Sequence, residues 1–287
     1  MRGYMKKIAV VSGKGGSGKT MVTTGLFKML SKTENVTIAD LDVECPDAGI
    51  YINNKKITDK ITTSVFIPSF IKEKCTGCKK CETACNFKAI SFFDDAITIF
   101  EELCKSCLRC VNVCKTGALT TRKIDYGEIS VYDVKGRSFF EGQLRIGDIR
   151  TKNLINEVKK LSEKSENTYV LYDSPPGTTC PMVAAVSSVD LVILVAEDSL
   201  YGFNDFQLAF SVVRDMKLDY WVLINKYVPE NSPVMKWCNE NNVAVGGCIP
   251  FSDKIHSHYS KGNNILELSE VADCLEKAVS HITGGAQ

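Results

Sequence analysis

Residues 7–20 read KIAVVSGKGGSGKT. Residues 7–12 form a short run rich in β-branched apolar side chains, which predicts a strand, and residues 20–32 have the pattern of an amphipathic helix. The glycine-rich loop between them would present backbone N–H groups and a helix N-terminus to a phosphate. We expect Lys19 to reach the β- and γ-phosphates of a nucleotide and Thr20 to bind Mg²⁺. The candidate nucleotide-binding residues of this loop are Gly13, Lys14, Gly15, Gly16, Ser17, Gly18, Lys19 and Thr20.

Three acidic residues follow two further predicted strands. Residues 36–42 (VTIADLD) end in Asp40 and Asp42, and residues 169–177 (YVLYDSPPG) place Asp173 at a strand end before a Pro-Pro-Gly turn. Ligands bind at the carboxyl edge of open parallel sheets, so we expect Asp173 to hold the water shell of Mg²⁺ and the Gly177 N–H to lie near a γ-phosphate. Taken singly, each acid could also end a strand or cap a helix. The pattern predicts an α/β fold with a mostly parallel sheet and helices on both faces.

These motifs together resemble the deviant Walker A ATPases of the MinD/ParA/Mrp and nitrogenase-iron-protein class. The resemblance implies that Lys14 binds the nucleotide of a partner subunit, that Asp40 and Asp42 are switch I acids, and that Asp42 orients the attacking water. Residues 173–177 resemble switch II. Asn225 resembles the residue that reads adenine, and Pro250 and Phe251 resemble the segment beside the base.

Composition limits the other possibilities. The chain has 287 residues, 44% of them hydrophobic, and its formal net charge is +1. A disordered chain, a coiled coil and a strongly basic nucleic-acid binder all fit these values poorly. The N-terminus offers no signal peptide, and residues 191–196, the longest apolar run near a predicted strand, are too short to span a membrane. Residues 267–281 predict an amphipathic helix with acidic positions, unlike a basic membrane anchor. We expect a soluble cytoplasmic protein that binds neither nucleic acid nor membrane.

Eight of the thirteen cysteines lie between residues 75 and 114. They form two runs of the spacing C-x₂-C-x₂-C-x₃-C, and the second run begins 29 residues after the first. This is an internal duplication. Residues 90–100, between the runs, predict a β-hairpin. In a reducing compartment, clustered thiols are more often metal ligands than disulfides.

The duplicated runs resemble a bacterial-type ferredoxin with two 4Fe-4S clusters, in which the fourth cysteine of each run binds the other cluster. Asn86 and Lys115 stand where such ferredoxins usually have proline, so their reduction potentials do not transfer. Zinc is the alternative for paired cysteines, although two identical four-cysteine runs favour interlocked clusters. The resemblance implies Cys75, Cys78, Cys81 and Cys114 as ligands of one cluster, and Cys104, Cys107, Cys110 and Cys85 as ligands of the other.

Together the two parts resemble MinD-superfamily ATPases with an inserted ferredoxin domain. We expect the ATPase in residues 1–63 and 124–287 and the insert in residues 64–123, with polar residues 52–63 and 125–142 leading in and out. The resemblance implies an ATP-dependent dimer of identical or paralogous chains that couples ATP hydrolysis to electron transfer. The alternative is an Mrp-like assembly or carrier protein that uses ATP to change its affinity for an apoprotein. A C-terminal C-x₂-C, typical of such carriers, is absent from this sequence.

Cys180 is a further candidate. It lies seven residues after Asp173, an offset at which the nitrogenase iron protein carries a cluster ligand. Pro181 fits the start of a predicted helix over residues 182–188, where the positive potential of the helix N-terminus would act on the thiol. Against a cluster role, the second ligating segment of that protein has no counterpart here, and a lone cysteine often only packs.

Overall fold

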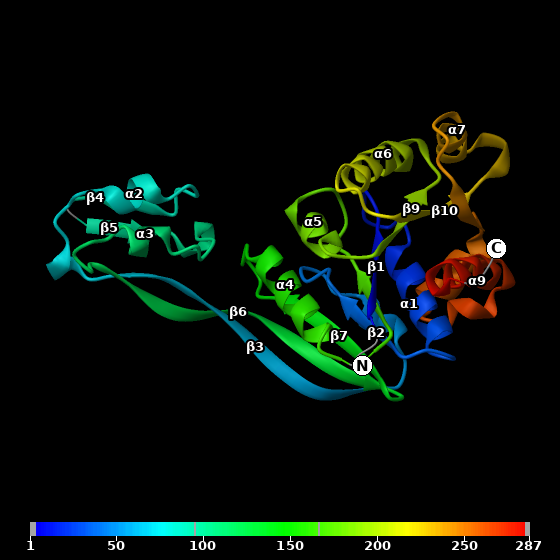
Figure 1. Ribbon diagram of the computed structural model, residues 1–287, viewed down its shortest axis with the longest axis horizontal. Helices are drawn as coiled ribbons and strands as arrows, with labels where there is room; N and C mark the ends of the chain where they lie inside the picture. The colour runs from blue at the N-terminus through cyan, green and yellow to red at the C-terminus, as the bar shows by residue number, and fades with distance from the viewer. Residues whose placement is uncertain (1–3, 95, 166, 285–287) are drawn as a thin grey trace.

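A nine-stranded sheet forms the centre of the molecule (Figure 1). The computed structural model describes residues 4–94, 96–165 and 167–284. The strand order is β11-β10-β9-β1-β8-β2-β7-β6-β3. The strands are β1 (Lys6–Val11), β2 (Val36–Asp40), β3 (Lys55–Phe70), β6 (Leu119–Val134), β7 (Arg137–Leu144), β8 (Tyr169–Asp173), β9 (Leu191–Glu197), β10 (Tyr220–Tyr227) and β11 (Val245–Pro250).

Seven neighbouring strands, from β11 to β7, run parallel, and β6 and β3 continue the sheet antiparallel. The parallel strands are short apolar runs because both of their faces are covered, as parallel sheets require. In β1, Ile8 and Val10 pack into the core on one face, and Ala9 and Val11 pack on the other. The mostly parallel α/β fold predicted from the sequence is confirmed.

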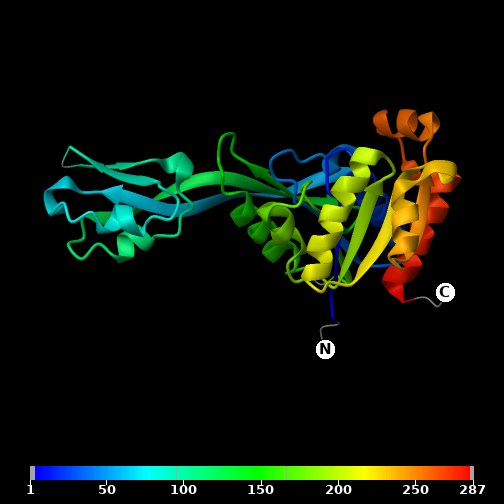
Figure 2. The same cartoon turned by 90° about the horizontal axis from the view of Figure 1, so that it is seen from above.

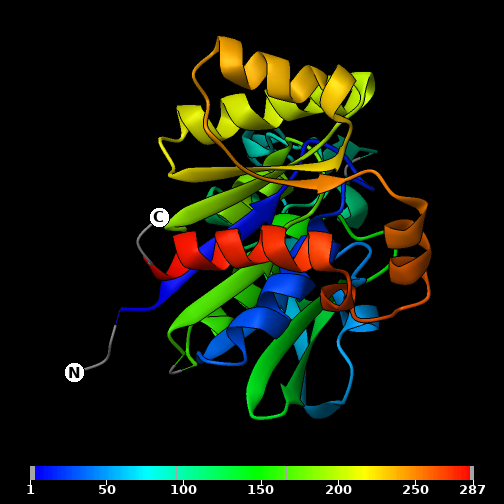
Figure 3. The ribbon, with the colours of Figure 1, turned by 90° about the vertical axis from the view of Figure 1, so that its right-hand side faces the viewer.

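Helices cover both faces of this sheet (Figure 3). None of the helices formed by residues 4–94, 96–165 and 167–284 has the length and apolar character needed to cross a bilayer. One face carries α1 (Lys19–Leu30), α8 (Asp253–Ser260) and α9 (Ser269–Thr283), and the other carries α4 (Thr151–Ser162), α5 (Cys180–Val186), α6 (Leu200–Asp215) and α7 (Pro233–Glu240).

The predicted elements around the phosphate-binding motif agree with the structure to within two residues, and β2 ends at Asp40 rather than at Asp42. In the sheet register, Asp173 of β8 is paired with Val10 of β1 on one side and with Asp40 of β2 on the other. The glycine-rich loop and both buried acids therefore emerge at the same edge.

The two longest strands, β3 and β6, form an arm that projects from the core (Figures 1 and 2). They include most of the polar residues 52–63 and 125–134, for which the sequence predicted no strands. The reason is that much of β3 is exposed, so no hydrophobic alternation marks it, and its partner lies about sixty residues away. The ladder has an irregularity at Thr63/Ser64, next to the expected start of the insert, and Tyr126 is left without a partner there.

Residues 71–94 and 96–118 lie at the far end of the arm (Figure 1). The predicted hairpin is present as β4 (Ile90–Phe93) and β5 (Ala96–Ile99). Short helices α2 (Lys80–Ala84) and α3 (Arg109–Asn112) occupy equivalent places in the two cysteine runs. The duplication in sequence is therefore also a duplication in structure. Single 3₁₀ turns complete the chain: η1 (Ala48–Tyr51), η2 (Lys72–Lys74), η3 (Glu101–Leu103), η4 (Pro229–Asn231) and η5 (Ile265–Glu267).

Candidate functional site

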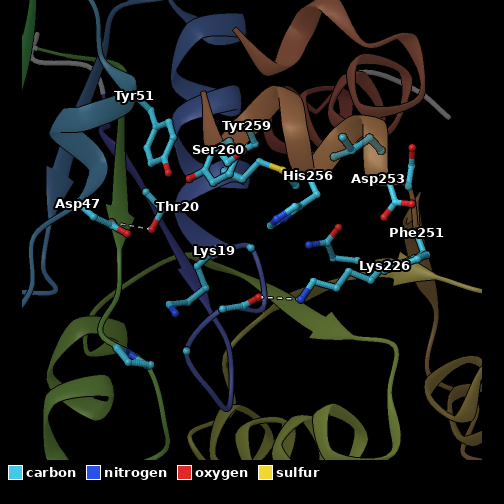
Figure 4. Close-up of a pocket in the computed structure, with 18 of the residues that line it drawn as sticks. Lys19, Thr20, Asp47, Tyr51, Lys226, Phe251, Asp253, His256, Tyr259 and Ser260 are labelled. Carbon is cyan, nitrogen blue, oxygen red and sulfur yellow. Dashed lines mark hydrogen bonds between the residues drawn. The ribbon is translucent and has the colours of Figure 1, made fainter. Parts of the chain in front are cut away.

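A pocket of about 720 Å³ opens at the carboxyl edge of the sheet (Figure 4). The glycine-rich loop forms its floor, residues 42–51 form one wall, and residues 250–260 form the wall across from it. Predicted site residues that line it are Gly15, Gly16, Gly18, Lys19, Thr20, Asp42, Asn225, Pro250 and Phe251. The pocket therefore joins segments that are far apart in the sequence, as the phosphate-binding prediction requires.

Backbone geometry makes glycine necessary at two points of the loop. Gly18 caps α1 with φ 100°, a left-handed conformation that other residues adopt only with strain. A Cβ atom on Gly13 would lie 1.9 Å from the Asp205 carbonyl oxygen. Lys19 is the first residue of α1 and extends into the pocket (Figure 4). Its ammonium group thus lies where the helix N-terminus already favours an anion.

Carboxylates gather behind Thr20. Asp40, Asp47 and Asp173 each have an oxygen within 4.8 Å of the others. The Thr20 hydroxyl donates to Asp47 Oδ1 at 2.9 Å, and Asp40 accepts from the Asp42, Asp47 and Ala48 N–H groups at 3.0 Å. Asp40 thereby fixes the loop that carries Asp42. Asp47 was not predicted from the sequence, because nothing in its local pattern marks it.

Asp173, like Asp40, is buried. Thr23 donates to its Oδ1 at 3.0 Å, while its Oδ2 is buried and has no hydrogen-bond partner among the described residues. A buried carboxylate oxygen without a donor is rare in native proteins. It fits a site completed by a cation or by water bound to a cation, and hydroxyl and carboxylate oxygens are the ligands that Mg²⁺ prefers.

Burial dominates the electrostatics of these acids. It raises the pKa of Asp173 to about 7, although the Thr20 hydroxyl and Lys19 oppose the shift. Burial, together with the charge of Asp173, also raises the pKa of Asp40 well above its ordinary value. For Asp42, burial raises the pKa to about 6 against the opposing charge of Lys19. Each of these carboxylates would gain from a cation nearby.

Lys14 lies beside the pocket and contacts its own chain. Its ammonium group donates to Glu197 Oε1 at 2.7 Å, and Lys226 donates to Glu197 Oε2 at 2.9 Å. Burial alone would raise the pKa of Glu197, but hydrogen bonds from the two lysines hold it below the ordinary value. Lys14 is thus held by an ionised carboxylate that no local sequence pattern marks.

The remaining predicted residues are placed less directly. The Asn225 side-chain amide donates to the Ser17 carbonyl at 2.8 Å, which ties this strand end to the glycine-rich loop. The Gly177 N–H donates to the Ser12 carbonyl at 3.2 Å, so in this structure it is bonded within the protein. Cys180 is the first residue of α5 and is exposed, which does not fit a packing role.

An aromatic pair that the sequence did not predict forms part of the pocket wall. The rings of Tyr51 and Tyr259 stack with centroids 4.0 Å apart and planes 10° apart. Tyr51 follows residues 42–47, which we call the acidic loop, and Tyr259 belongs to α8. The stack therefore joins the two walls of the pocket (Figure 4). Only the tertiary structure brings these residues together.

The eight clustered cysteines surround two separate hollows at the end of the arm. The distal hollow is lined by Cys75, Cys78, Cys81 and Cys114, and the proximal hollow by Cys85, Cys104, Cys107 and Cys110. None of the eight takes part in a disulfide. In both sets, three cysteines come from one run and the fourth comes from the other run. The structure therefore brings together the two crossed quartets that the ferredoxin resemblance implies, and four thiols around each hollow fit a 4Fe-4S cluster.

The loops around the hollows share an unusual backbone. Gly77 and Lys79 in the first run, and Ser106 and Leu108 in the second, all have positive φ. The left-handed conformation costs roughly 1–2 kcal/mol for a residue other than glycine. Two equivalent loops with this conformation wrap their cysteines around a centre rather than forming a plain helix.

We call the hollow lined by Cys104 and Cys107 proximal because the loop between these cysteines contacts the core, and we call the other hollow distal. Lys105, in the proximal loop, donates to the Ile149 carbonyl of the core at 2.9 Å. Lys79 and Lys80 lie at the distal hollow, beside the exposed Cys78. The two hollows thus follow one another from the core towards the end of the molecule.

The buried acids give a prediction for the nucleotide-free and metal-free protein. Asp173 has a folded pKa of about 7, above the ordinary value of 3.8, so its contribution to stability is lost as pH rises through this range. We expect Asp173→Asn to raise the free energy of unfolding by about 1 kcal/mol or more near pH 8, measured by urea unfolding in EDTA. Mg²⁺ with ATP should stabilise the wild type and not the variant. Asp253→Asn, on an exposed pocket residue, serves as the control, and a destabilised Asp173→Asn protein would contradict the prediction.

Comparison with known proteins supports the reading of the pocket. Residues 8–265 match the CobQ/CobB/MinD/ParA nucleotide binding domain family. The chain is 30% identical over 226 residues to the uncharacterized protein MJ0578 of Methanocaldococcus jannaschii, covering 78% of this chain and 79% of that protein. It is 23% identical to MJ0579 of the same organism, covering 98% of this chain and 99% of that protein.

The fold resembles that of the septum site-determining protein MinD of Pyrococcus horikoshii, solved in complex with Mg-ADP. The TM-score is 0.61 at 18% identity, and the match covers 97% of this chain and 96% of that one. The family match extends over the glycine-rich loop, the strands that carry Asp40 and Asp173, and the Asn225 strand. The chain therefore belongs to the CobQ/CobB/MinD/ParA family of nucleotide-binding domains.

Proposed function

We propose that this protein is an ATPase that couples a nucleotide-driven dimer switch to electron transfer through two 4Fe-4S clusters. The observation that carries the proposal is the presence, in one chain, of this family's nucleotide pocket and two crossed cysteine quartets around separate hollows. The proposed insert begins near residue 64 and ends near residue 123, with the cysteines beyond the ends of β3 and β6.

In the proposed nucleotide site, the glycine-rich loop and the acidic residues behind it bind the phosphates and Mg²⁺. The loop amides and Lys19 bind the phosphates, and Thr20 with Asp173 and Asp40 holds Mg²⁺ or its water shell. Asp42 lies in the loop that Asp40 holds in place through hydrogen bonds from backbone N–H groups. When Asp42 is ionised, it orients the attacking water. Its pKa of about 6 leaves it mainly ionised at neutral pH.

At the other end of the pocket, Asn225 and the segment Pro250–Phe251 bind the base. Phe251 is 62% exposed, so an aromatic face is free to pack against a planar ring. This places the base at the β10 and β11 end of the pocket and the phosphates at β1. A nucleotide so oriented spans the glycine-rich loop.

The dimer side of the proposal depends on Lys14. It leaves Glu197 when two chains meet, and its charge then stabilises the phosphates bound by the partner subunit. Glu197 keeps Lys226 as a counterion, so the departure of Lys14 does not leave the largely buried Glu197 carboxylate unpaired. The partner is an identical chain or a paralogue.

In the proposed function, the eight clustered cysteines are the iron ligands. Cys75, Cys78, Cys81 and Cys114 hold the distal cluster, and Cys85, Cys104, Cys107 and Cys110 hold the proximal one. When bound, these clusters supply one-electron chemistry, and the protein supplies their order along the arm. Apolar side chains line each hollow, including Phe92 and Ile97 at the distal one and Phe87 and Ile90 at the proximal one. Such walls limit the access of water and tune the potential.

Substitutions of the two lysines of the glycine-rich loop should have different effects on ATP binding and hydrolysis. Lys19→Ala should abolish ATP binding, because it removes the direct phosphate contact. Lys14→Ala should leave binding within about twofold and remove ATP-dependent dimerisation and hydrolysis, because its contact is made across the interface. Calorimetry and light scattering measure these properties, and Lys60→Ala, on the exposed arm, is the control. Normal hydrolysis by Lys14→Ala would show that the switch does not use this lysine.

Pairs of cysteine substitutions test the crossed ligation. The anaerobically purified wild type should hold about eight irons and eight sulfides. Cys75→Ala with Cys114→Ala removes two ligands of one cluster, so about four irons should remain. Cys75→Ala with Cys85→Ala damages both clusters and should leave fewer. The reverse order would mean that each run binds its own cluster, and stoichiometric zinc without sulfide would exclude clusters altogether.

Coupling is tested on the reduced, anaerobic holoprotein. Mg-ATP should accelerate oxidation of the clusters by benzyl viologen about fivefold or more, and this acceleration should vanish in Lys14→Ala. Transfer of iron and sulfide to an apo-ferredoxin is measured in parallel. If ATP accelerates that transfer and leaves the oxidation rate unchanged, the protein is an assembly or carrier protein instead.

A further inference from the structure

Arg150 joins the proximal cysteine loop to the nucleotide-binding core. Its Nε donates to Ser106 Oγ at 3.0 Å, and its Nη2 donates to the Glu101 carbonyl at 3.1 Å. Ser106 lies between Cys104 and Cys107, two residues that line the proximal hollow. The neighbouring Lys105 makes its own bond to Ile149. Three hydrogen bonds thus hold this loop against the residues just before α4.

The guanidinium group of Arg150 is buried at this contact. The side chain is only 3% exposed, and its Nη1 pairs with Asp148 Oδ2 at 2.5 Å. A buried charge destabilises a protein unless it is paired and hydrogen-bonded, and here Nε and both terminal nitrogens have partners. Such an arrangement fixes geometry more than it adds stability. It suits a residue whose task is to set the position of the loop.

Helix α4 begins at the next residue and contacts the acidic loop of the pocket. The Thr151 hydroxyl donates to Glu44 Oε1 at 2.7 Å. Glu44 lies two residues after Asp42, and Val43 between them accepts a hydrogen bond from Leu144 N at 2.7 Å. The loop that carries Asp42 is therefore tied to the first turn of α4. Arg150 and Thr151 are adjacent, so one backbone segment contacts both sites.

The second half of α4 contacts the end of α5, the helix that follows residues 173–177. Lys159 donates to the carbonyls of Ala184, Ala185 and Ser187 at 3.0, 2.8 and 2.5 Å. These carbonyls belong to the end of α5, which follows residues 173–177. In addition, Glu157 accepts a hydrogen bond from Tyr126 of the arm at 2.8 Å. Helix α4 and its N-cap residue Arg150 are thus bonded to the loop that carries Asp42, to the end of α5, to the arm and to the proximal loop.

We propose that Arg150 is a positioning residue for the proximal cluster and that α4 transmits the nucleotide state to it. A displacement of residues 42–47 or 173–177 on ATP binding moves α4 through Glu44 and the α5 carbonyls. Arg150 then carries that movement to the loop containing Cys104 and Cys107. The proposal rests on the proposed function, since it requires both nucleotide and clusters.

The test compares Arg150→Gln with the wild type as anaerobic holoprotein. Hydrogen exchange of amides 101–108 is measured with and without a non-hydrolysable ATP analogue and Mg²⁺, together with the reduction potential of each cluster. In the wild type, the analogue should change the exchange and the proximal potential. In Arg150→Gln, both nucleotide-dependent changes should fall about fivefold or more, with iron content and nucleotide affinity unchanged. A merely structural role would alter iron content or stability without removing the nucleotide dependence selectively.

Arg122→Gln is the matched control. Arg122 also pairs with Glu101, but the side chains of both residues are exposed and this ion pair does not reach the core. It should keep the full nucleotide response. Thr151→Val breaks the Glu44 bond while leaving Arg150 in place, and it should also lose the response. If Arg150→Gln does not fold or does not load iron, the nucleotide response of Thr151→Val tests the proposal instead.

The outcomes separate this inference from the proposed function. A wild type without iron, or without ATP binding, overturns the proposed function. A wild type that has both clusters and binds ATP, but whose amides 101–108 and proximal potential ignore the nucleotide, overturns only the α4 proposal. Full responses in both Arg150→Gln and Thr151→Val overturn it as well.

Discussion

The hydrogen-bond register of β8 between β1 and β2 is the constraint on which the site depends. It pairs Asp173 with Val10 on one side and with Asp40 on the other. Because the three strands are parallel, the glycine-rich loop and both acids leave the sheet at one edge. A shift of one residue would turn Asp173 to the opposite face and bring Tyr172 or Ser174 to the site.

That register also accounts for the electrostatic character of the pocket. It buries carboxylates close together, which raises their pKa values and opposes their ionisation. The hydroxyl of Thr23 and the backbone N–H groups around Asp40 offset part of this cost. A cation beside these carboxylates would offset the rest, because an opposite charge favours their ionised form. Binding sites in folded proteins commonly trade stability for function in this way.

The arm determines how the cysteine-rich part relates to this pocket. Two paired strands of sixteen residues each are far stiffer than polar linkers of that length would be. Tyr126, which has no partner at the irregularity in the ladder, is buried and bonded to Glu157 of α4. The arm is thus anchored to the same helix that contacts the pocket loops. A stiff, anchored arm keeps the proximal hollow beside the core, within hydrogen-bonding reach of Arg150.

What the sequence determined by itself was local. The spacing of glycines, lysines and cysteines is written along short segments, so the phosphate loop, the acidic strand ends, the hairpin and the duplicated cysteine runs could all be predicted. The crossed quartets came from resemblance to ferredoxins, and the structure brings those cysteines together. The strands of the arm could not be predicted, because exposed strands lack hydrophobic alternation and their pairing spans about sixty residues. The roles of three further residues could not be predicted either, because each acts through a partner distant in sequence: Asp47, Glu197 and Arg150. Only the packed chain decides which of these groups meet.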